Sequence, residues 1–127
     1  MQSEPQSDGP LVMVAEDDLD IRELLQGLLG DEGYRVRATG DGVAALDIAV
    51  REGPAAIVLD LGLPGMAGPD FCRAYRERGG RAPVVLVTAA NSAIVETAMQ
   101  SCGAAAYIRK PFDIEDIMDM LERLVRP

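Results

Sequence analysis

The chain has 127 residues and a formal net charge of −9, and 48% of its residues are hydrophobic. This length is sufficient for one domain with a single core, without disulfides or a structural metal. The negative charge disfavours direct binding to nucleic acid, because phosphate backbones attract basic surfaces. The sequence contains no histidine, which removes the commonest general base and a common zinc ligand.

The sequence also lacks targeting and membrane signals. No apolar run approaches the length needed to cross a membrane, and the N-terminus lacks the charged-then-apolar pattern of a secretion signal. Cys72 and Cys102 lie in predicted helices and form no CxxC motif, so we expect both to be reduced thiols. These features predict a cytoplasmic protein that does not associate with membranes.

Short apolar runs alternate with helical patterns five times along the chain, after a polar leader that we expect to be flexible over residues 1–10. The expected strands span residues 11–15, 34–38, 56–59, 83–88 and 104–109. The expected helices lie between Asp18 and Gly33, between Asp41 and Gly53, from Pro69 to about Arg78, from Asn91 or Ser92 to Ser101, and from Asp113 to Val125. This alternation predicts a doubly wound α/β fold with a five-stranded parallel sheet and right-handed crossovers.

The run from Ala56 to Leu59 is the expected central strand. Its four consecutive apolar residues indicate burial on both faces, and Pro64 and Gly65 mark the turn that follows. Asp60 therefore stands at the carboxyl end of a central strand, the edge at which open parallel sheets bind ligands. A strand-end aspartate also commonly caps the next loop, so Asp60 alone does not distinguish a binding site from a cap.

Polar residues follow three other expected strands. Glu16 and Asp17 come directly after the first strand, Thr88 ends the fourth, and Lys110 follows the fifth. All of these residues must lie along one edge of the sheet, together with Asp60. Three carboxylates at adjacent strand ends repel one another unless a cation lies between them. Mg²⁺ suits this position, because it favours carboxylate ligands together with phosphate oxygens.

Four short motifs occur in a fixed order and spacing along the chain. They are Val14-Ala15-Glu16-Asp17-Asp18, Leu59-Asp60-Leu61-Gly62-Leu63-Pro64-Gly65, Val87-Thr88-Ala89 and Lys110-Pro111-Phe112. Each motif alone is weakly specific, but the four in register resemble the receiver domain of two-component response regulators. The resemblance covers Leu11 to Val125 and implies a receiver domain over residues 11–127. It also implies the flavodoxin-like strand order 2-1-3-4-5.

The resemblance implies a role for each strand-end residue. Asp60 would accept a phosphoryl group from a histidine kinase or a histidine phosphotransfer protein. Lys110 would pair with the phosphoryl oxygens, and Thr88 would hydrogen-bond to one of them. The ligands of Mg²⁺ would be the side chains of Glu16, Asp17 and Asp60 and the main-chain carbonyl of Gly62. In-line phosphoryl transfer needs a positioned nucleophile, a metal and a cation, which this set supplies.

The resemblance further implies how a signal leaves the domain. The Lys110–Pro111 bond would be a cis peptide that directs the lysine inward. Tyr107 matches the switch aromatic of the family, and a half-buried tyrosine at a strand edge is an equally good interpretation. Thr88 and Tyr107 would then alter a face that a downstream protein reads. This face is formed by the helix over residues 92–101, the strand over residues 104–109 and the helix over residues 113–125.

Some positions depart from the usual family pattern. Gly62 stands where the family usually has a larger side chain, and Ala90, two residues after Thr88, offers no polar group. Neither side chain can orient or obstruct a hydrolytic water. Ala105-Ala106 occupies a place where DNA-binding regulators often carry an Asp-Asp pair for a salt-bridged dimer. Ala67-Gly68 replaces a common Asp-Gly. We therefore expect an intact phosphoacceptor site and an unusual output surface.

The favoured hypothesis is a signalling switch that carries a transient aspartyl phosphate. An enzyme with such an intermediate would need a second acid beside the nucleophile, and Asp60-Leu61-Gly62 supplies none. A phosphorylation-independent adaptor would not need the four other strand-end residues. A flavin-binding module would need a phosphate cradle where the first strand-to-helix turn is acidic. Both a stand-alone receiver and a part of a longer regulator fit the sequence.

Overall fold

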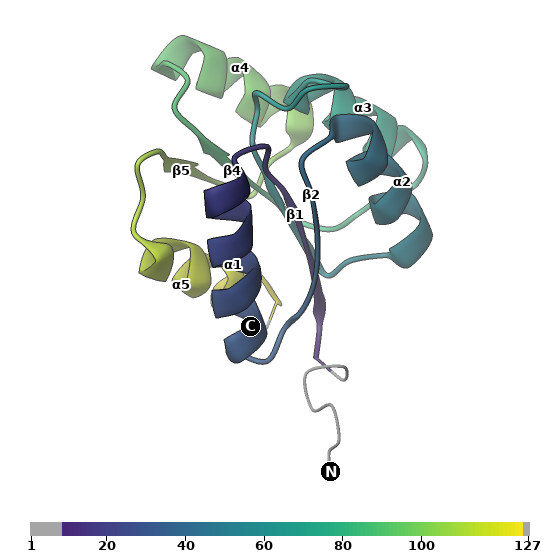
Figure 1. Cartoon of the computed structure of the whole chain (residues 1–127). Helices are drawn as coiled ribbons and strands as arrows, with labels where there is room; N and C mark the ends of the chain where they lie inside the picture. Colours follow the sequence, from purple (N-terminus) through teal and green to yellow (C-terminus); the bar gives the residue numbers. More distant parts are fainter. Residues whose placement is uncertain (1–8, 126–127) are drawn as a thin grey trace.

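The structure, a computed structural model, describes residues 9–125. Within them, a single parallel sheet has the strand order β2-β1-β3-β4-β5 (Figure 1). The strands are β1 (Leu11–Ala15), β2 (Arg35–Thr39), β3 (Ala56–Leu59), β4 (Val84–Thr88) and β5 (Ala106–Arg109). The helices are α1 (Leu19–Asp31), α2 (Gly42–Glu52), α3 (Gly68–Glu77), α4 (Ser92–Cys102) and α5 (Ile114–Val125). The predicted α/β fold and strand order are confirmed.

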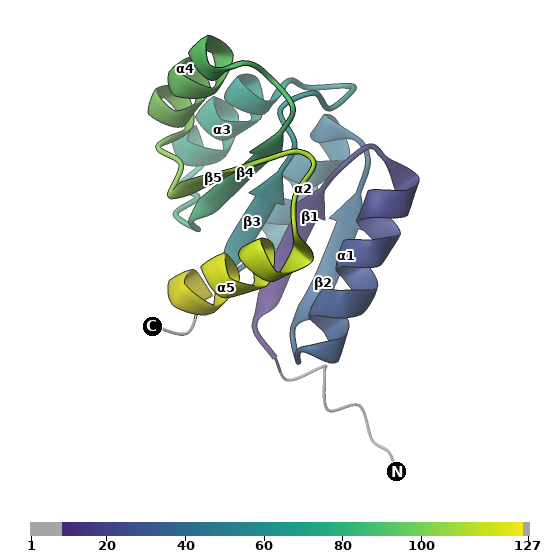
Figure 2. The same cartoon turned by 90° about the vertical axis from the view of Figure 1, so that its left-hand side faces the viewer.

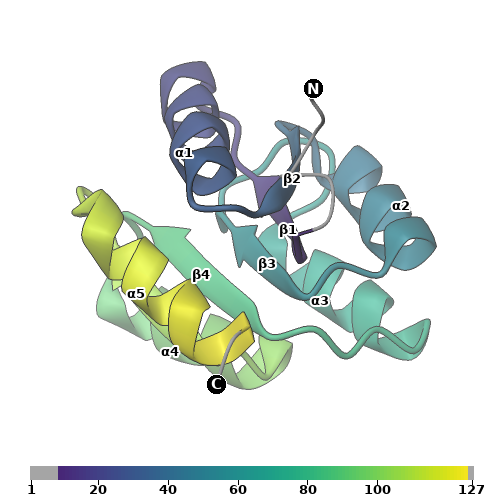
Figure 3. The same ribbon diagram turned by 90° about the horizontal axis from the view of Figure 1, so that it is seen from below.

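Helices cover both faces of the sheet (Figures 2 and 3). Successive side chains of a strand point to opposite faces, so each strand contributes to two hydrophobic clusters. Ile57 and Leu59 pack with residues of α2, α3 and α4, whereas Val58 packs with residues of α1 and α5. The continuous apolar runs of β1, β3 and β4 are explained by this burial on both sides.

The register of the central strands aligns their carboxyl ends. Ala15 of β1 pairs with Leu59 of β3, and the amide of Asp60 donates a hydrogen bond to the carbonyl of Ala15 at 2.9 Å. On the other side of β3, the amide of Lys110 donates to the carbonyl of Thr88 at 2.9 Å. The residues that follow these strands are therefore brought to one edge of the sheet.

Helix starts follow the local capping rules. The side chains of Asp18, Asp41 and Asn91 accept hydrogen bonds from the amides of Ile21, Ala44 and Ile94, respectively. Three predicted strand starts are wrong by one or two residues, because β2, β4 and β5 begin at Arg35, Val84 and Ala106 and not at Tyr34, Pro83 and Ala104. The amide of Tyr34 donates to Leu29 of α1 and that of Ala104 donates to Met99 of α4, so both residues complete helix ends. Strands β2 and β5 therefore begin at Arg35 and Ala106.

The prediction that Cys72 and Cys102 are reduced thiols is wrong for this structure. They form a disulfide between α3 and α4, with their Cα atoms 4.8 Å apart, and no free cysteine remains. The residues are separated by 30 positions in sequence. They meet because α3 and α4 lie side by side on the same face of the sheet (Figure 2).

The expected flexible leader over residues 1–10 lies almost entirely outside the described residues. Its last two residues contact β2: the carbonyl of Gly9 accepts a hydrogen bond from Arg35 Nε at 2.8 Å, and that of Pro10 from the Arg35 amide at 3.0 Å. Among residues 9–125, no helix is long and apolar enough to span a bilayer.

Candidate functional site

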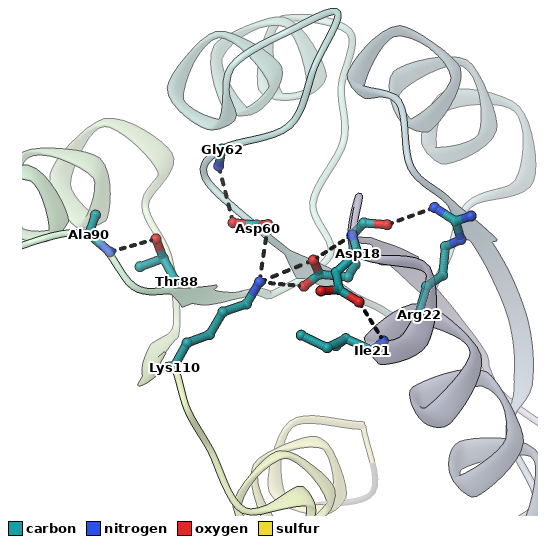
Figure 4. A network of polar contacts seen from close by, with 9 residues as sticks. Asp18, Ile21, Arg22, Asp60, Gly62, Thr88, Ala90 and Lys110 are labelled. Atoms are coloured by element: carbon teal, nitrogen blue, oxygen red, sulfur yellow. Dashed lines mark hydrogen bonds and ion pairs between the residues drawn. The ribbon is translucent and has the colours of Figure 1, made fainter.

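Among the predicted strand-end residues, Asp60, Thr88 and Lys110 meet at the carboxyl edge of the sheet (Figure 4). Lys110 reaches across this edge from the end of β5 to the ends of β3 and β1. Its Nζ atom lies 2.9 Å from Glu16 Oε1 and 3.2 Å from Asp60 Oδ2. The Lys110–Pro111 peptide bond is cis, as the resemblance implied. One ammonium group therefore bridges two carboxylates that stand on neighbouring strands.

Glu16 is held firmly in the turn after β1. Its carboxylate Oε2 accepts a hydrogen bond from the amide of Asp18 at 3.1 Å. Its own amide donates to the carbonyl of Thr39 at 3.0 Å, and its carbonyl accepts from Arg22 Nη1 at 3.0 Å. The side chain of Glu16 is only 2% exposed. These contacts fix both the backbone and the carboxylate of Glu16.

Burial and charge perturb the two partners of this ion pair. Burial raises the pKa of the Glu16 carboxyl, and hydrogen bonds from Lys110 and the Asp18 amide offset only part of this effect. Burial alone would lower the pKa of Lys110, but its hydrogen bond to Glu16 and the charges of Asp60 and Glu16 raise it. Lys110 therefore stays a cation, and a negative environment surrounds it.

The acidic side chains fit a divalent cation. One carboxylate oxygen from each of Glu16, Asp17 and Asp60 lies within 4.8 Å of the others. Glu16 and Asp60 are buried and Asp17 is exposed, so the group opens to solvent on one side. Lys110 compensates only part of this negative charge. Three oxygen donors with one open side are suited to Mg²⁺, which retains several waters when it binds to proteins.

Asp60 and Lys110 line an open hollow of about 450 Å³, together with Thr88 and the residues Leu61, Gly62, Ala89, Ala90 and Ile94. The hydroxyl of Thr88 accepts a hydrogen bond from the amide of Ala90 at 3.1 Å, and Asp60 Oδ1 accepts one from the amide of Gly62 at 3.1 Å. A Cβ atom added to Gly62 would meet only Asp60 Oδ1, at 3.9 Å. No bulky side chain therefore blocks the approach at Gly62.

Tyr107 is half-buried at the boundary between α4 and β5, where it lines a hollow with Val95 and Met99 of α4. Its hydroxyl accepts a hydrogen bond from Arg109 Nη1 at 3.0 Å, and the same nitrogen donates to the carbonyl of Ala90 at 3.5 Å. A switch role for Tyr107 stays a prediction. The structure adds a physical link between this tyrosine and the loop after Thr88.

Arg22 and Arg109 were not recognised from the sequence as neighbours of the site. Arg109 stands two residues after Tyr107 on a strand, so the alternation of side chains indicates that both lie on one face. No sequence pattern indicates that Arg22 lies at the site, because its hydrogen bond to the carbonyl of Glu16 depends on how α1 packs beside the β1–α1 turn.

Comparisons with known proteins agree with this geometry. The family model of the response regulator receiver domain matches residues 12–122. Response regulator MprA of Mycobacterium leprae is 35% identical over 115 residues, which are 91% of this chain and 50% of that protein. The chain thus spans about half the length of the curated relatives it matches.

Solved structures show the same similarity. The receiver domain of the sensor histidine kinase PA1611 from Pseudomonas aeruginosa, solved with a magnesium ion coordinated in its active site cleft, is 29% identical with a TM-score of 0.85. The alignment covers 94% of this chain and 99% of that one. The BeF3-activated N-terminal receiver domain of RstA from Klebsiella pneumoniae is 28% identical with a TM-score of 0.82, covering 92% and 99%. Since the family model matches almost all described residues, the chain belongs to the response regulator receiver domain family.

Proposed function

We propose that this domain is the phosphoacceptor switch of a two-component or phosphorelay system, with Asp60 as the residue that becomes phosphorylated. The observation that carries the proposal is the position of Lys110 Nζ, which contacts both Asp60 and Glu16 beside an open hollow. The donor would be the phosphohistidine of a histidine kinase or of a histidine phosphotransfer protein.

The geometry accounts for the transfer step. One carboxylate oxygen of Asp60 attacks phosphorus, and the phosphorus–nitrogen bond of the phosphohistidine breaks as the new phosphorus–oxygen bond forms. Negative charge on the three equatorial oxygens then needs cationic and hydrogen-bonding partners. Lys110 supplies the cation. The hydroxyl of Thr88 accepts from the Ala90 amide, so its own hydrogen is available for a phosphoryl oxygen.

Glu16, Asp17 and Asp60 would hold Mg²⁺, with the carbonyl of Gly62 as a further proposed ligand. The ion would neutralise the negative charge of the phosphoryl oxygens and of the acidic side chains. The arrangement of the three carboxylates in this chain supports this role, and so does the magnesium ion in the PA1611 receiver domain. Lys110 would hold Asp60 in place for the reaction, since its ammonium group donates to Asp60 and is itself held by Glu16.

The output would be a conformational change of the face formed by α4, β5 and α5. A phosphoryl group on Asp60, in contact with Thr88 and Lys110, would stabilise one arrangement of the loop after β4 over another. Tyr107 and Arg109 contact this loop and α4, so they would transmit the change. The partner that reads the face would be a downstream protein. We expect the domain itself to bind no nucleic acid, and to catalyse only its own phosphorylation and dephosphorylation.

Phosphorylation by a small-molecule donor tests the assignment directly. Incubation with acetyl phosphate and Mg²⁺ should add the mass of one phosphoryl group to the intact protein. Asp60→Asn should abolish the added mass, and excess EDTA should abolish it in the parent chain. The matched control is Asp70→Asn, because Asp70 is an exposed acid in α3 that lies outside the site. Full labelling of Asp60→Asn would refute the site, and full labelling in EDTA would refute the metal requirement.

A further inference from the structure

The disulfide between Cys72 and Cys102 ties two helices together in the core. Cys72 lies in the middle of α3 with 0% exposure, and Cys102 is the last residue of α4 with 1% exposure. Their Cα separation of 4.8 Å is within the range that disulfides usually show. The backbone of α3 and α4 therefore already has the spacing that the bond requires.

The same site also suits the reduced state. Cys102 Sγ lies 3.9 Å from the carbonyl of Gly68, so a thiol at this position has an acceptor for its weak S–H donor. Arg76 Nη2 donates to the carbonyl of Cys102 at 3.4 Å, which places a cation beside the end of α4.

The bridge lies at the opposite end of α4 from the phosphoacceptor site. Ile94, in the first turn of α4, lines the hollow that contains Asp60, whereas Cys102 is at the last turn. Gly103 then ends the helix in a left-handed conformation with φ 58°. Helix ends open more easily than helix centres, so a small oxidant or reductant can reach Cys102 through transient opening of this turn.

We propose that Cys72 and Cys102 are a reversible redox modification site, whose disulfide clamps the C-terminal end of α4 onto α3 and whose reduction releases it. With hydrogen peroxide as the oxidant, one thiol loses its proton and its sulfur attacks a peroxide oxygen. The O–O bond breaks, the sulfur becomes a sulfenic acid, and the departing hydroxide takes up the proton and leaves as the first water. The second thiol attacks this sulfur, forms the S–S bond and releases a second water. A dithiol reductant reverses the modification through exchange, and is itself converted to a disulfide.

Thiol labelling tests whether the couple exists. The chain is treated with hydrogen peroxide or with a phosphine reductant, then denatured and alkylated with N-ethylmaleimide. The reduced protein should carry two adducts, and the oxidised protein none. Cys72→Ala and Cys102→Ala, each with one thiol, should form no intramolecular bridge. Two adducts on the peroxide-treated parent chain would overturn the proposal, and so would an oxidised form that the reductant cannot restore.

Amide hydrogen exchange tests whether the bond clamps α4. In the oxidised protein, the amides of Gln100, Ser101 and Cys102 should exchange about tenfold more slowly than in the reduced protein, because the bond restricts opened forms. Leu25 and Leu29 of α1, on the other face of the sheet, serve as internal controls and should be much less affected. Equal exchange of the α4 amides in both redox states would overturn the clamp.

The clamp should limit the response of α4 to phosphorylation, a consequence that rests on the proposed function. Beryllofluoride with Mg²⁺, used as a phosphoryl mimic, should shift the Gly62 amide equally in both redox forms. Shifts of Gln100 to Cys102 should be smaller in the oxidised form. If the Gly62 amide shifts but the amides of Gln100 to Cys102 shift equally in the oxidised and reduced forms, the disulfide does not limit the response of α4. No Gly62 shift in either form would instead refute the proposed function, while the exchange rates would still decide on the clamp.

Discussion

Lys110 should be the main stabilising residue of the site when no metal is bound. Its ammonium group lies 2.9 Å from Glu16 and 3.2 Å from Asp60. At an effective dielectric constant of about 20, these distances correspond to gross attractions of about 6 and about 5 kcal/mol. Most of this attraction compensates the desolvation of side chains that are only 18%, 2% and 10% exposed for Lys110, Glu16 and Asp60. Removal of the lysine leaves two buried carboxylates facing each other.

Lys110→Met keeps the apolar stem and removes the charge. Loss of one partner of a buried ion pair costs about 3 to 5 kcal/mol, and the partial exposure of Lys110 favours the lower end of that range. We therefore expect the free energy of unfolding to fall by about 3 kcal/mol at pH 7 in EDTA. Urea unfolding monitored by circular dichroism measures this change. Added Mg²⁺ should recover part of the loss, because it binds the folded form.

Two further variants test whether the loss of stability comes from the unpaired carboxylates beside Lys110 and not from the loss of any positive charge. Lys110→Met combined with Glu16→Gln should be more stable than Lys110→Met alone in EDTA, because one unpaired carboxylate is gone. Arg37→Met breaks the exposed ion pair with Glu52 and should change stability by less than about 1 kcal/mol. A Lys110→Met variant as stable as the parent chain in EDTA would contradict the stabilising role of Lys110. A double variant less stable than Lys110→Met alone would contradict it as well.

Further predictions concern the lifetime of the phosphoryl group, the core and a helix start. The side chains at Gly62 and Ala90 cannot orient a water for hydrolysis, so the phosphoryl group should last minutes or longer after the donor is removed. Its decay is compared with that in Ala90→Glu. Decay within seconds in the parent chain would contradict this prediction. Phe71 is 0% exposed, and Phe71→Ala should lower the free energy of unfolding by about 3 to 5 kcal/mol in urea titrations. A loss below about 1 kcal/mol would show that Phe71 is not a packing centre. Asp41 accepts a hydrogen bond from the Ala44 amide at 2.9 Å. Asp41→Ala should therefore lower the free energy of unfolding by about 1 kcal/mol, and Asp41→Asn should lower it by less. Equal losses in the two variants would argue against a capping role for Asp41.

Local rules acting over a few residues were sufficient for most of the fold. The apolar runs of β1, β3 and β4 and the caps Asp18, Asp41 and Asn91 depend on neighbours within about four positions, so a sequence pattern reveals them. The carboxyl edge of a parallel sheet is a topological consequence of strand–helix alternation. For this reason the sequence alone indicates which strand-end residues lie close together.

Contacts between distant segments were decided only by the tertiary structure. Lys110 and Glu16 are separated by 94 positions, and the sequence does not state that one ammonium reaches both Glu16 and Asp60. The bridge between Cys72 and Cys102 depends on the spacing of α3 and α4, which is set by the side chains packed between these helices and the sheet. Propensity and periodicity describe single elements, whereas distances between elements follow from the packing of the whole core.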